Sequence, residues 1–156
     1  MPHAQSDGAR IYWEETGKGT PIIFVHEFGG DHRSWDDQMR HFGRGWRAIT
    51  MAARGYPLSE APKGDQHYGQ DFFNRDVIAV LDDAGVDKAH VVGLSMGGYA
   101  ALMVASKYPS RVLSCVAAGA GSGSVMDTRP HFIEECRKTA AGFDAAGRID
   151  GEGMGY

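Results

Sequence analysis

Short apolar runs bounded by turn-forming residues recur along the chain. They cover residues 22–25, 48–51, 91–92 and 112–116. Because they are largely uninterrupted rather than alternating, they are typical of strands buried on both faces, as in a parallel sheet. An earlier stretch, residues 10–14, alternates in part and precedes a glycine-rich turn at residues 17–19, so it predicts an antiparallel edge strand that enters by a hairpin.

Between the apolar runs, nonpolar residues recur at helical spacing. This spacing predicts helices over residues 35–42 behind a candidate N-cap at Ser34, residues 73–84 ending at Gly85, and residues 96–108 stopping before Pro109. Strands and helices therefore alternate. The order strand, helix, strand, helix, strand, helix, strand predicts a doubly wound α/β fold with a mostly parallel sheet and right-handed crossovers.

The composition changes after Ala118. The glycine-rich letters GAGSGS occupy residues 119–124, and a polar stretch that we predict to be helical covers residues 129–141. We therefore expect two parts. Residues 1–118 form the N-terminal part of an α/β core, and residues 119–156 form a linker and the start of a cap- or lid-like segment.

Composition narrows the class of ligand. The formal net charge is −4 and no basic face or long charge run occurs, so we expect no nucleic-acid partner and no membrane partner. A small neutral or apolar ligand fits better. The N-terminus lacks a basic region followed by an apolar stretch, and no run of about 18 apolar residues occurs, which is typical of a cytoplasmic protein. Cys115 and Cys136 lack CxxC spacing, so we expect free thiols, no metal site and no cofactor.

The letters GLSMG at residues 93–97 satisfy the pattern G-x-S-x-G between a buried strand and a helix. A serine in that context occupies a sharp, strained turn that lifts its hydroxyl above the carboxyl edge of the sheet, and its neighbours must be small. The first N–H groups of the following helix favour a developing oxyanion. Ser95 is therefore the candidate nucleophile. The alternative is a glycine-rich turn that matches the pattern by chance.

A second glycine-rich turn, HEFGG at residues 26–30, lies at the end of an apolar strand. Acyl transfer requires two N–H donors that converge on one oxygen, commonly one after the nucleophile and one from the loop after an adjacent strand. Phe28 and Met96 are the candidate donors of this oxyanion hole, and His26 and Glu27 are candidate pocket-lining residues. An ordinary strand-to-helix turn is the alternative.

With these motifs in this order, the chain resembles the α/β-hydrolase fold superfamily, in particular its esterases, lactonases, cofactor-free haloperoxidase-like enzymes and carbon–carbon bond hydrolases. The resemblance covers about residues 10–118. It rests on the turn at 26–30, an Arg-Gly turn at Arg54, and the strand-to-helix turn at 93–97 that carries Ser95, which we call the elbow. Two motifs depart from the common pattern. Glu27 replaces a glycine, and residues 52–59, AARGYPLS, lack the acid and one glycine of D-x-R-G-x-G-x-S.

The resemblance implies attack by Ser95 on an ester-like carbonyl through an acyl-enzyme, since dehalogenases and epoxide hydrolases of this fold carry an aspartate at the elbow. It also implies the chain order nucleophile, acid, histidine, with the last two on loops beyond the strand at 112–116. The chain ends near the point where a lid usually begins. We therefore expect a sheet truncated before its last strands and a triad acid and histidine outside this sequence.

The residues present do not supply a good base for Ser95. His131 is the one histidine that follows the serine, and it lies in the polar stretch where a solvated helix position is expected. The resemblance gives His26 to loop structure rather than to proton transfer. Three acids that follow the serine fit a charged helix face: Asp127, Glu134 and Glu135.

Three functional hypotheses remain open. The first is a serine hydrolase of small carboxylic esters, and the second is a non-catalytic ligand-binding or interaction module that retains the elbow for its shape. The third is acyl transfer or perhydrolysis on the same serine, because water, alcohol and peroxide compete for one acyl-enzyme. In each case the strand at 112–116 would be a sheet edge, so we also expect self-association through it.

Overall fold

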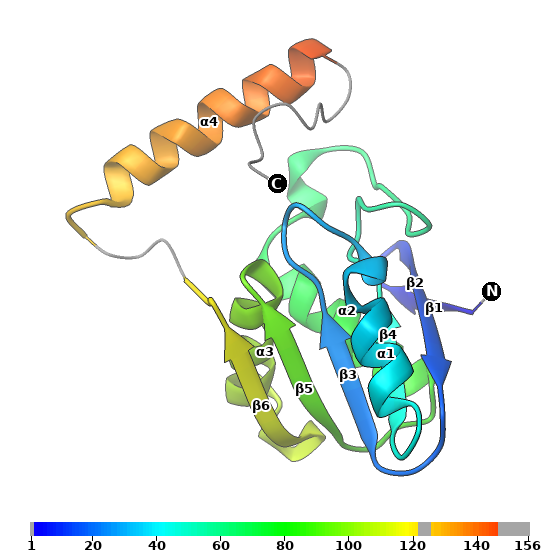
Figure 1. Ribbon diagram of the computed structural model, residues 1–156. Coiled ribbons are helices and arrows are strands. Elements are labelled where there is room, and N and C mark those ends of the chain that lie inside the picture. Colours follow the sequence, from blue (N-terminus) through cyan, green and yellow to red (C-terminus); the bar gives the residue numbers. More distant parts are fainter. Residues whose placement is uncertain (1, 122–125, 147–156) are drawn as a thin grey trace. The chain divides into compact units, whose positions relative to one another are not determined.

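The computed structural model describes residues 2–121 and 126–146, which belong to two compact units, Met1–Ala120 and Gly121–Tyr156. The first unit contains a six-stranded sheet in the order β1-β2-β4-β3-β5-β6 (Figure 1). The strands are β1 (His3–Ser6), β2 (Ala9–Thr16), β3 (Pro21–Val25), β4 (Arg47–Met51), β5 (Ala89–Leu94) and β6 (Val112–Ala118). β4, β3, β5 and β6 are parallel, which confirms the α/β fold class.

The N-terminal strands differ in part from the prediction. β2 is antiparallel to β4, as expected, but it is not the edge strand, because β1 pairs with its other side. The sequence pattern did not reveal β1. Its four residues, HAQS, contain no large apolar side chain, and their burial alternates only through Ala4 and Ser6.

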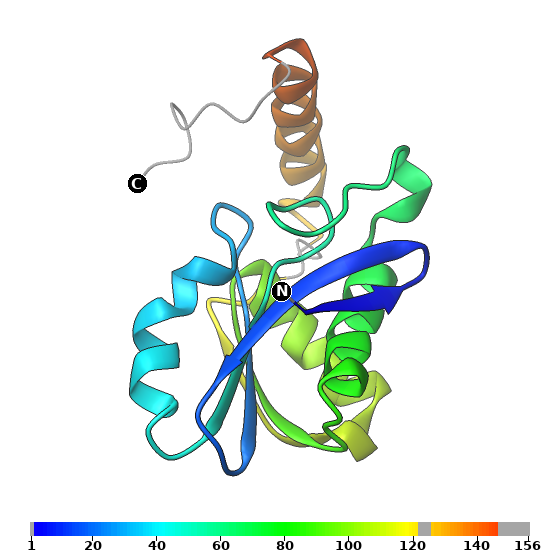
Figure 2. The ribbon, with the colours of Figure 1, turned by 90° about the vertical axis from the view of Figure 1, so that its right-hand side faces the viewer.

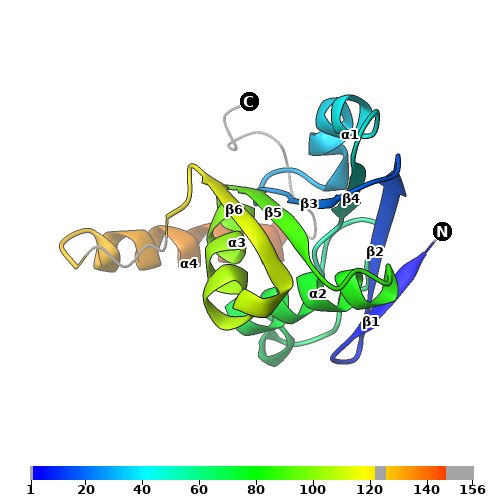
Figure 3. The same cartoon turned by 90° about the horizontal axis from the view of Figure 1, so that it is seen from below.

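Helices cover both faces of the sheet (Figures 2 and 3). On one face, α1 (Asp36–Phe42) packs Phe42 against Phe24 of β3, with the ring centroids 5.6 Å apart, and Met39 joins the same core cluster. On the other face lie α2 (Gln70–Asp83) and α3 (Met96–Lys107), whose buried residues join the main core. The central strands β3 and β4 are thus buried on both sides along most of their length, as their uninterrupted apolar runs predicted. β5 is buried on one face and mostly half-buried on the other, and β6 is mostly exposed, so the expectation of burial on both faces is wrong for the run at 112–116.

The helix boundaries confirm two predictions and correct one. α2 ends just before Gly85, and α3 ends before Pro109. Ser34, however, is not the N-cap of α1. A short 3₁₀ helix, η1 (His32–Trp35), comes first, and Asp31 caps it by accepting a hydrogen bond of 2.9 Å from the Arg33 N–H. The Asp31 carboxylate thus takes the capping role predicted for Ser34, and the Ser34 hydroxyl is available for another hydrogen-bond partner.

The second unit contributes one described helix, α4 (Arg129–Ala146). It begins where the polar stretch predicted a helix and extends beyond residue 141. None of its residues is buried. Across the described parts of the chain, no helix has both the length and the apolar character needed to cross a membrane.

Candidate active site

Ser95 lies between the last residue of β5 and the first residue of α3, at the carboxyl end of the parallel strands. Its backbone has φ 51° and ψ −111°, a conformation that is strained by about 1–3 kcal/mol for a residue with a side chain. Two hydrogen bonds hold this turn: the Ser95 N–H donates to the Ala118 carbonyl at 2.8 Å, and the Tyr99 N–H donates to the Ser95 carbonyl at 3.0 Å. The serine is exposed, as the elbow motif predicts.

The flanking glycines are required by close backbone packing. A side chain at Gly93 would overlap the carbonyl of Gly97, and a side chain at Gly97 would overlap the carbonyls of Val25 and His26. The first turn of α3 therefore lies directly against the end of β3, where the 26–30 turn begins. The two glycine-rich motifs of the sequence meet at this point.

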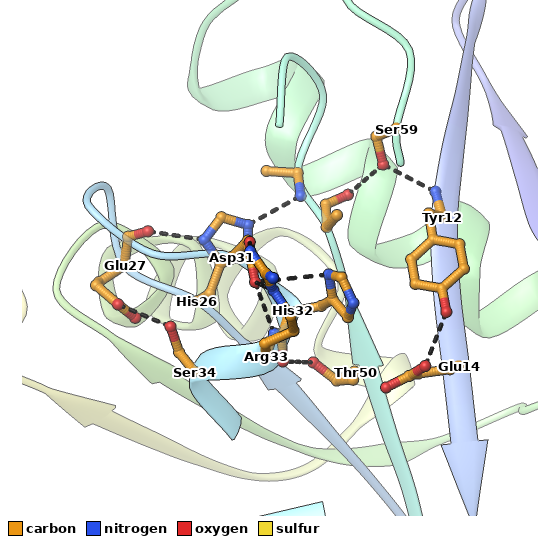
Figure 4. A network of polar contacts seen from close by, with 12 residues as sticks. Tyr12, Glu14, His26, Glu27, Asp31, His32, Arg33, Ser34, Thr50 and Ser59 are labelled. Carbon is orange, nitrogen blue, oxygen red and sulfur yellow. Dashed lines mark hydrogen bonds and ion pairs between the residues drawn. The ribbon is translucent and has the colours of Figure 1, made fainter. Parts of the chain in front are cut away.

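His26 is fully buried and fixes the start of the 26–30 turn (Figure 4). Its Nε2 accepts a hydrogen bond of 3.0 Å from the Ala53 N–H, so the proton resides on Nδ1, which donates to the Glu27 carbonyl at 2.7 Å. Burial lowers the pKa of His26, and the hydrogen bond to Glu27 opposes this only in part. His26 is thus a neutral internal support beneath the turn, without the exposed surface that a pocket-lining residue or a general base requires.

Phe28 and Met96 come close to each other through a third residue. Phe28 is about half exposed, and its carbonyl accepts a hydrogen bond of 2.8 Å from the Tyr56 hydroxyl. The same hydroxyl lies 4.0 Å from the Met96 sulfur. The structure therefore brings both Phe28 and Met96 into contact with the side chain of Tyr56, a residue that the sequence reasoning did not single out.

Glu27 turns its carboxylate toward η1 (Figure 4). Its Oε1 accepts a hydrogen bond of 2.9 Å from the Ser34 hydroxyl, and its Oε2 is buried without a hydrogen-bond partner in the described residues. A side chain at Gly30 would overlap both the carboxylate and the Ser34 hydroxyl. An acid replaces the usual glycine at position 27 because Gly30 leaves room for it.

The Arg-Gly turn after β4 is tied to α2 by a buried ion pair, which we call the Arg54–Asp76 clamp. Arg54 is almost fully buried, and its guanidinium donates two hydrogen bonds to Asp76 of α2, at 2.7 and 2.5 Å. A further hydrogen bond of 2.8 Å goes from Arg54 to the His67 carbonyl. Ser59 accepts from the Tyr12 N–H at 2.8 Å and donates to the Ala52 carbonyl at 2.7 Å. The motif that replaces D-x-R-G-x-G-x-S therefore anchors the turn that carries Tyr56.

Within residues 2–120 of the first unit, no histidine or carboxylate hydrogen-bonds to the Ser95 hydroxyl. His131 is exposed on α4 of the second unit. Asp127 is exposed, and Glu134 and Glu135 pair with Lys138 on the surface of the helix. Residues 2–121 and 126–146 contain no group of three His, Cys, Asp or Glu side chains that could hold a metal ion.

The known proteins that are similar to this chain include several hydrolases. The family model described as "alpha/beta hydrolase fold" matches residues 20–148. The chain is 36% identical over 117 residues to the 2-hydroxy-6-oxo-6-phenylhexa-2,4-dienoate hydrolase of Burkholderia cepacia, covering 72% of this chain and 40% of that protein. It is 32% identical over 105 residues to epoxide hydrolase 1 of Caenorhabditis elegans, covering 66% of this chain and 26% of that protein.

Solved structures of similar enzymes superpose on this chain. Est816, an N-acyl homoserine lactone degrading enzyme, superposes with a TM-score of 0.73 at 35% identity, covering 78% of this chain and 46% of that chain. A meta-cleavage product hydrolase from Pseudomonas fluorescens superposes with a TM-score of 0.71 at 25% identity, covering 77% and 45%. The chain therefore spans less than half the length of these relatives.

Proposed function

Since the chain belongs to the α/β-hydrolase fold family, we propose that it carries the nucleophile and the oxyanion hole of a serine hydrolase that acts on small carboxylic esters. The observation that carries the proposal is the strained backbone of Ser95, at φ 51° and ψ −111°, in an exposed turn at the start of α3. Strain of this kind persists only where the surrounding structure enforces it, and here close glycine contacts and two hydrogen bonds do so.

The proposed reaction proceeds through an acyl-enzyme. The Ser95 hydroxyl attacks the ester carbonyl while its proton moves to a base, and the carbonyl oxygen becomes an oxyanion that accepts hydrogen bonds from the Phe28 and Met96 N–H groups. The intermediate collapses, and the leaving alcohol takes the proton. Water then hydrolyses the acylated serine to a carboxylic acid. The base and its orienting acid would come from outside residues 2–120, because this part of the chain offers the Ser95 hydroxyl no such partner.

The position of Met96 favours this role. Its N–H belongs to the first turn of α3, where backbone N–H groups have no partner within the helix and the helix dipole presents its positive end. A negative oxygen placed above Ser95 would therefore be stabilised by the fold itself.

Two features favour an ester over an epoxide as the substrate. A serine stands at the elbow, where the epoxide hydrolases of this fold carry an aspartate, so nucleophilic attack would form an acyl-enzyme. The relative Est816 degrades a lactone, and a lactone is a cyclic ester. Acyl transfer and perhydrolysis would use the same acyl-enzyme and differ only in the acceptor.

Labelling with an activated ester tests the proposal. We expect p-nitrophenyl acetate to release p-nitrophenol and to add one acetyl group per chain, which mass spectrometry locates at Ser95. The variant Ser95→Ala should lose the label, whereas the matched control Ser110→Ala, at another exposed serine, should keep it. A single acetylation without turnover would mean that the oxyanion hole works but deacylation lacks its base. The absence of any label at Ser95 would favour the non-catalytic binding module.

A further inference from the structure

Tyr56 occupies the junction of the three motifs. It follows the Arg54 turn, it is partly buried against the main core, and its ring stands edge-on to His26 with the ring centroids 4.6 Å apart. Its hydroxyl donates to the Phe28 carbonyl at 2.8 Å and lies 4.0 Å from the Met96 sulfur. One hydroxyl therefore contacts both residues whose N–H groups form the proposed oxyanion hole.

The two peptide groups that flank Phe28 are held separately. In the peptide that joins Glu27 to Phe28, the carbonyl accepts from His26 Nδ1 at 2.7 Å. Because a trans peptide is planar, the Phe28 N–H then points the opposite way from that carbonyl. In the next peptide, the Phe28 carbonyl accepts from Tyr56. His26 and Tyr56 together restrict the rotation of Phe28 on both sides, and hence the direction of its N–H.

We propose that Tyr56 is a positioning residue for the oxyanion hole: its hydroxyl fixes the Phe28 peptide, so that the Phe28 N–H is aimed before the substrate binds. This inference rests on the proposed function of Ser95 and deepens it. An oxyanion donor is effective because it is oriented in advance, so a donor that can turn away loses much of its effect.

The variant Tyr56→Phe removes the hydroxyl but keeps the ring that packs against His26. In saturation kinetics of Ser95 acetylation by p-nitrophenyl acetate, we expect the maximal acylation rate to fall about tenfold, which is less than the loss of a whole donor. The half-saturating ester concentration should stay the same, because the Tyr56 hydroxyl is proposed to act on the Phe28 peptide, to which it is hydrogen-bonded, rather than on the ester. Substitution of Tyr56 by 3-fluorotyrosine, which keeps a hydroxyl donor, should restore the rate.

Tyr68→Phe is the matched control. Its hydroxyl also donates to a backbone carbonyl, that of Pro62 at 2.9 Å, in the loop that follows the same turn. We expect no change in the acylation rate for this variant. Equal rates in Tyr56→Phe and Tyr68→Phe would overturn the inference. So would the loss of a cooperative thermal transition in Tyr56→Phe, because the hydroxyl would then support the fold rather than the donor.

Amide hydrogen exchange separates this inference from the proposed function, because it requires no chemistry at Ser95. We expect exchange at residues 27–30 to become about fivefold faster in Tyr56→Phe and to stay unchanged in Tyr68→Phe. Unchanged exchange in Tyr56→Phe would overturn the role of Tyr56 even if Ser95 is acetylated. Faster exchange would support the positioning of the Phe28 peptide even if Ser95 is never labelled and the proposed function fails.

Discussion

At the scale of single residues, the site depends on groups whose protonation or conformation is set by their neighbours. Ser95 is held in a left-handed conformation, and burial keeps His26 neutral. Asp31, directly after the 26–30 turn, is held ionised by Arg33, whose hydrogen bonds lower the pKa of the carboxyl from 3.8 to about 2. His26, Asp31 and Arg33 lie within one short stretch of chain, so local electrostatics and the geometry of the 26–30 turn are linked.

The low pKa of Asp31 predicts a specific dependence of stability on pH. Because the pKa is lower in the folded state, the stabilisation is fully present above about pH 4 and is lost as the pH falls toward 2. The lowered pKa corresponds to about 2 kcal/mol at most, since Arg33 is largely exposed. In urea unfolding, Asp31→Asn should reduce stability at pH 7 and flatten its decline between pH 4 and 2.

Asp37→Asn is the control for this experiment, because Asp37 pairs with Arg40 on the open surface. We expect it to leave the free energy of unfolding nearly unchanged across the same pH range. A decline of equal steepness in Asp31→Asn and in the parent protein would show that Arg33 does not hold this carboxyl.

At the scale of elements, the ion pair of Arg54 and Asp76 ties the loop after β4 to α2. Both side chains are buried, with 5% and 0% of their surface exposed. A buried charge is tolerated because its partner and its hydrogen bonds replace water, so the removal of one partner leaves the other charge uncompensated. The clamp therefore holds the loop that presents Tyr56.

A double-mutant cycle tests this clamp. We expect Arg54→Met and Asp76→Leu each to lower the free energy of unfolding by about 3–5 kcal/mol, and the double variant to lose clearly less than the sum. Urea unfolding at pH 7 measures all four proteins. Additive losses would mean that the two charges stabilise the fold independently. They would contradict the coupling that the two hydrogen bonds between Arg54 and Asp76 predict.

The elements also show what sequence patterns can and cannot predict. The four apolar runs were sufficient to predict the parallel strands, although only β3 and β4 are buried on both faces along most of their length. The elbow could be predicted because steric demands on Gly93 and Gly97 arise within one turn. The roles of Tyr56 and Asp76 could not be predicted in this way. Tyr56 lies 28 positions from its partner Phe28 and Asp76 lies 22 positions from its partner Arg54, so no local spacing reveals either pair.

At the scale of the whole molecule, β6 lies at one edge of the sheet and β1 at the other, and among the described strands β6 pairs with β5 alone (Figure 1). Leu113 and Val116 on this strand are 47% and 52% exposed. Val116 pairs with Val92 of β5, so it belongs to the face on which α1 packs against β3. An unpaired strand edge with exposed apolar side chains is a template for pairing with another chain.

Self-association through this edge is therefore expected, and sedimentation velocity at increasing protein concentration would measure it. Val116→Lys should shift the distribution toward the monomer, because a charge on an edge strand opposes pairing with a second copy. Leu58→Lys is the control, since Leu58 is equally exposed, at 51%, but lies in the loop after β4 rather than on the edge. If both variants and the parent protein sediment alike, β6 is not the contact; if only Val116→Lys becomes monomeric, the edge strand mediates association.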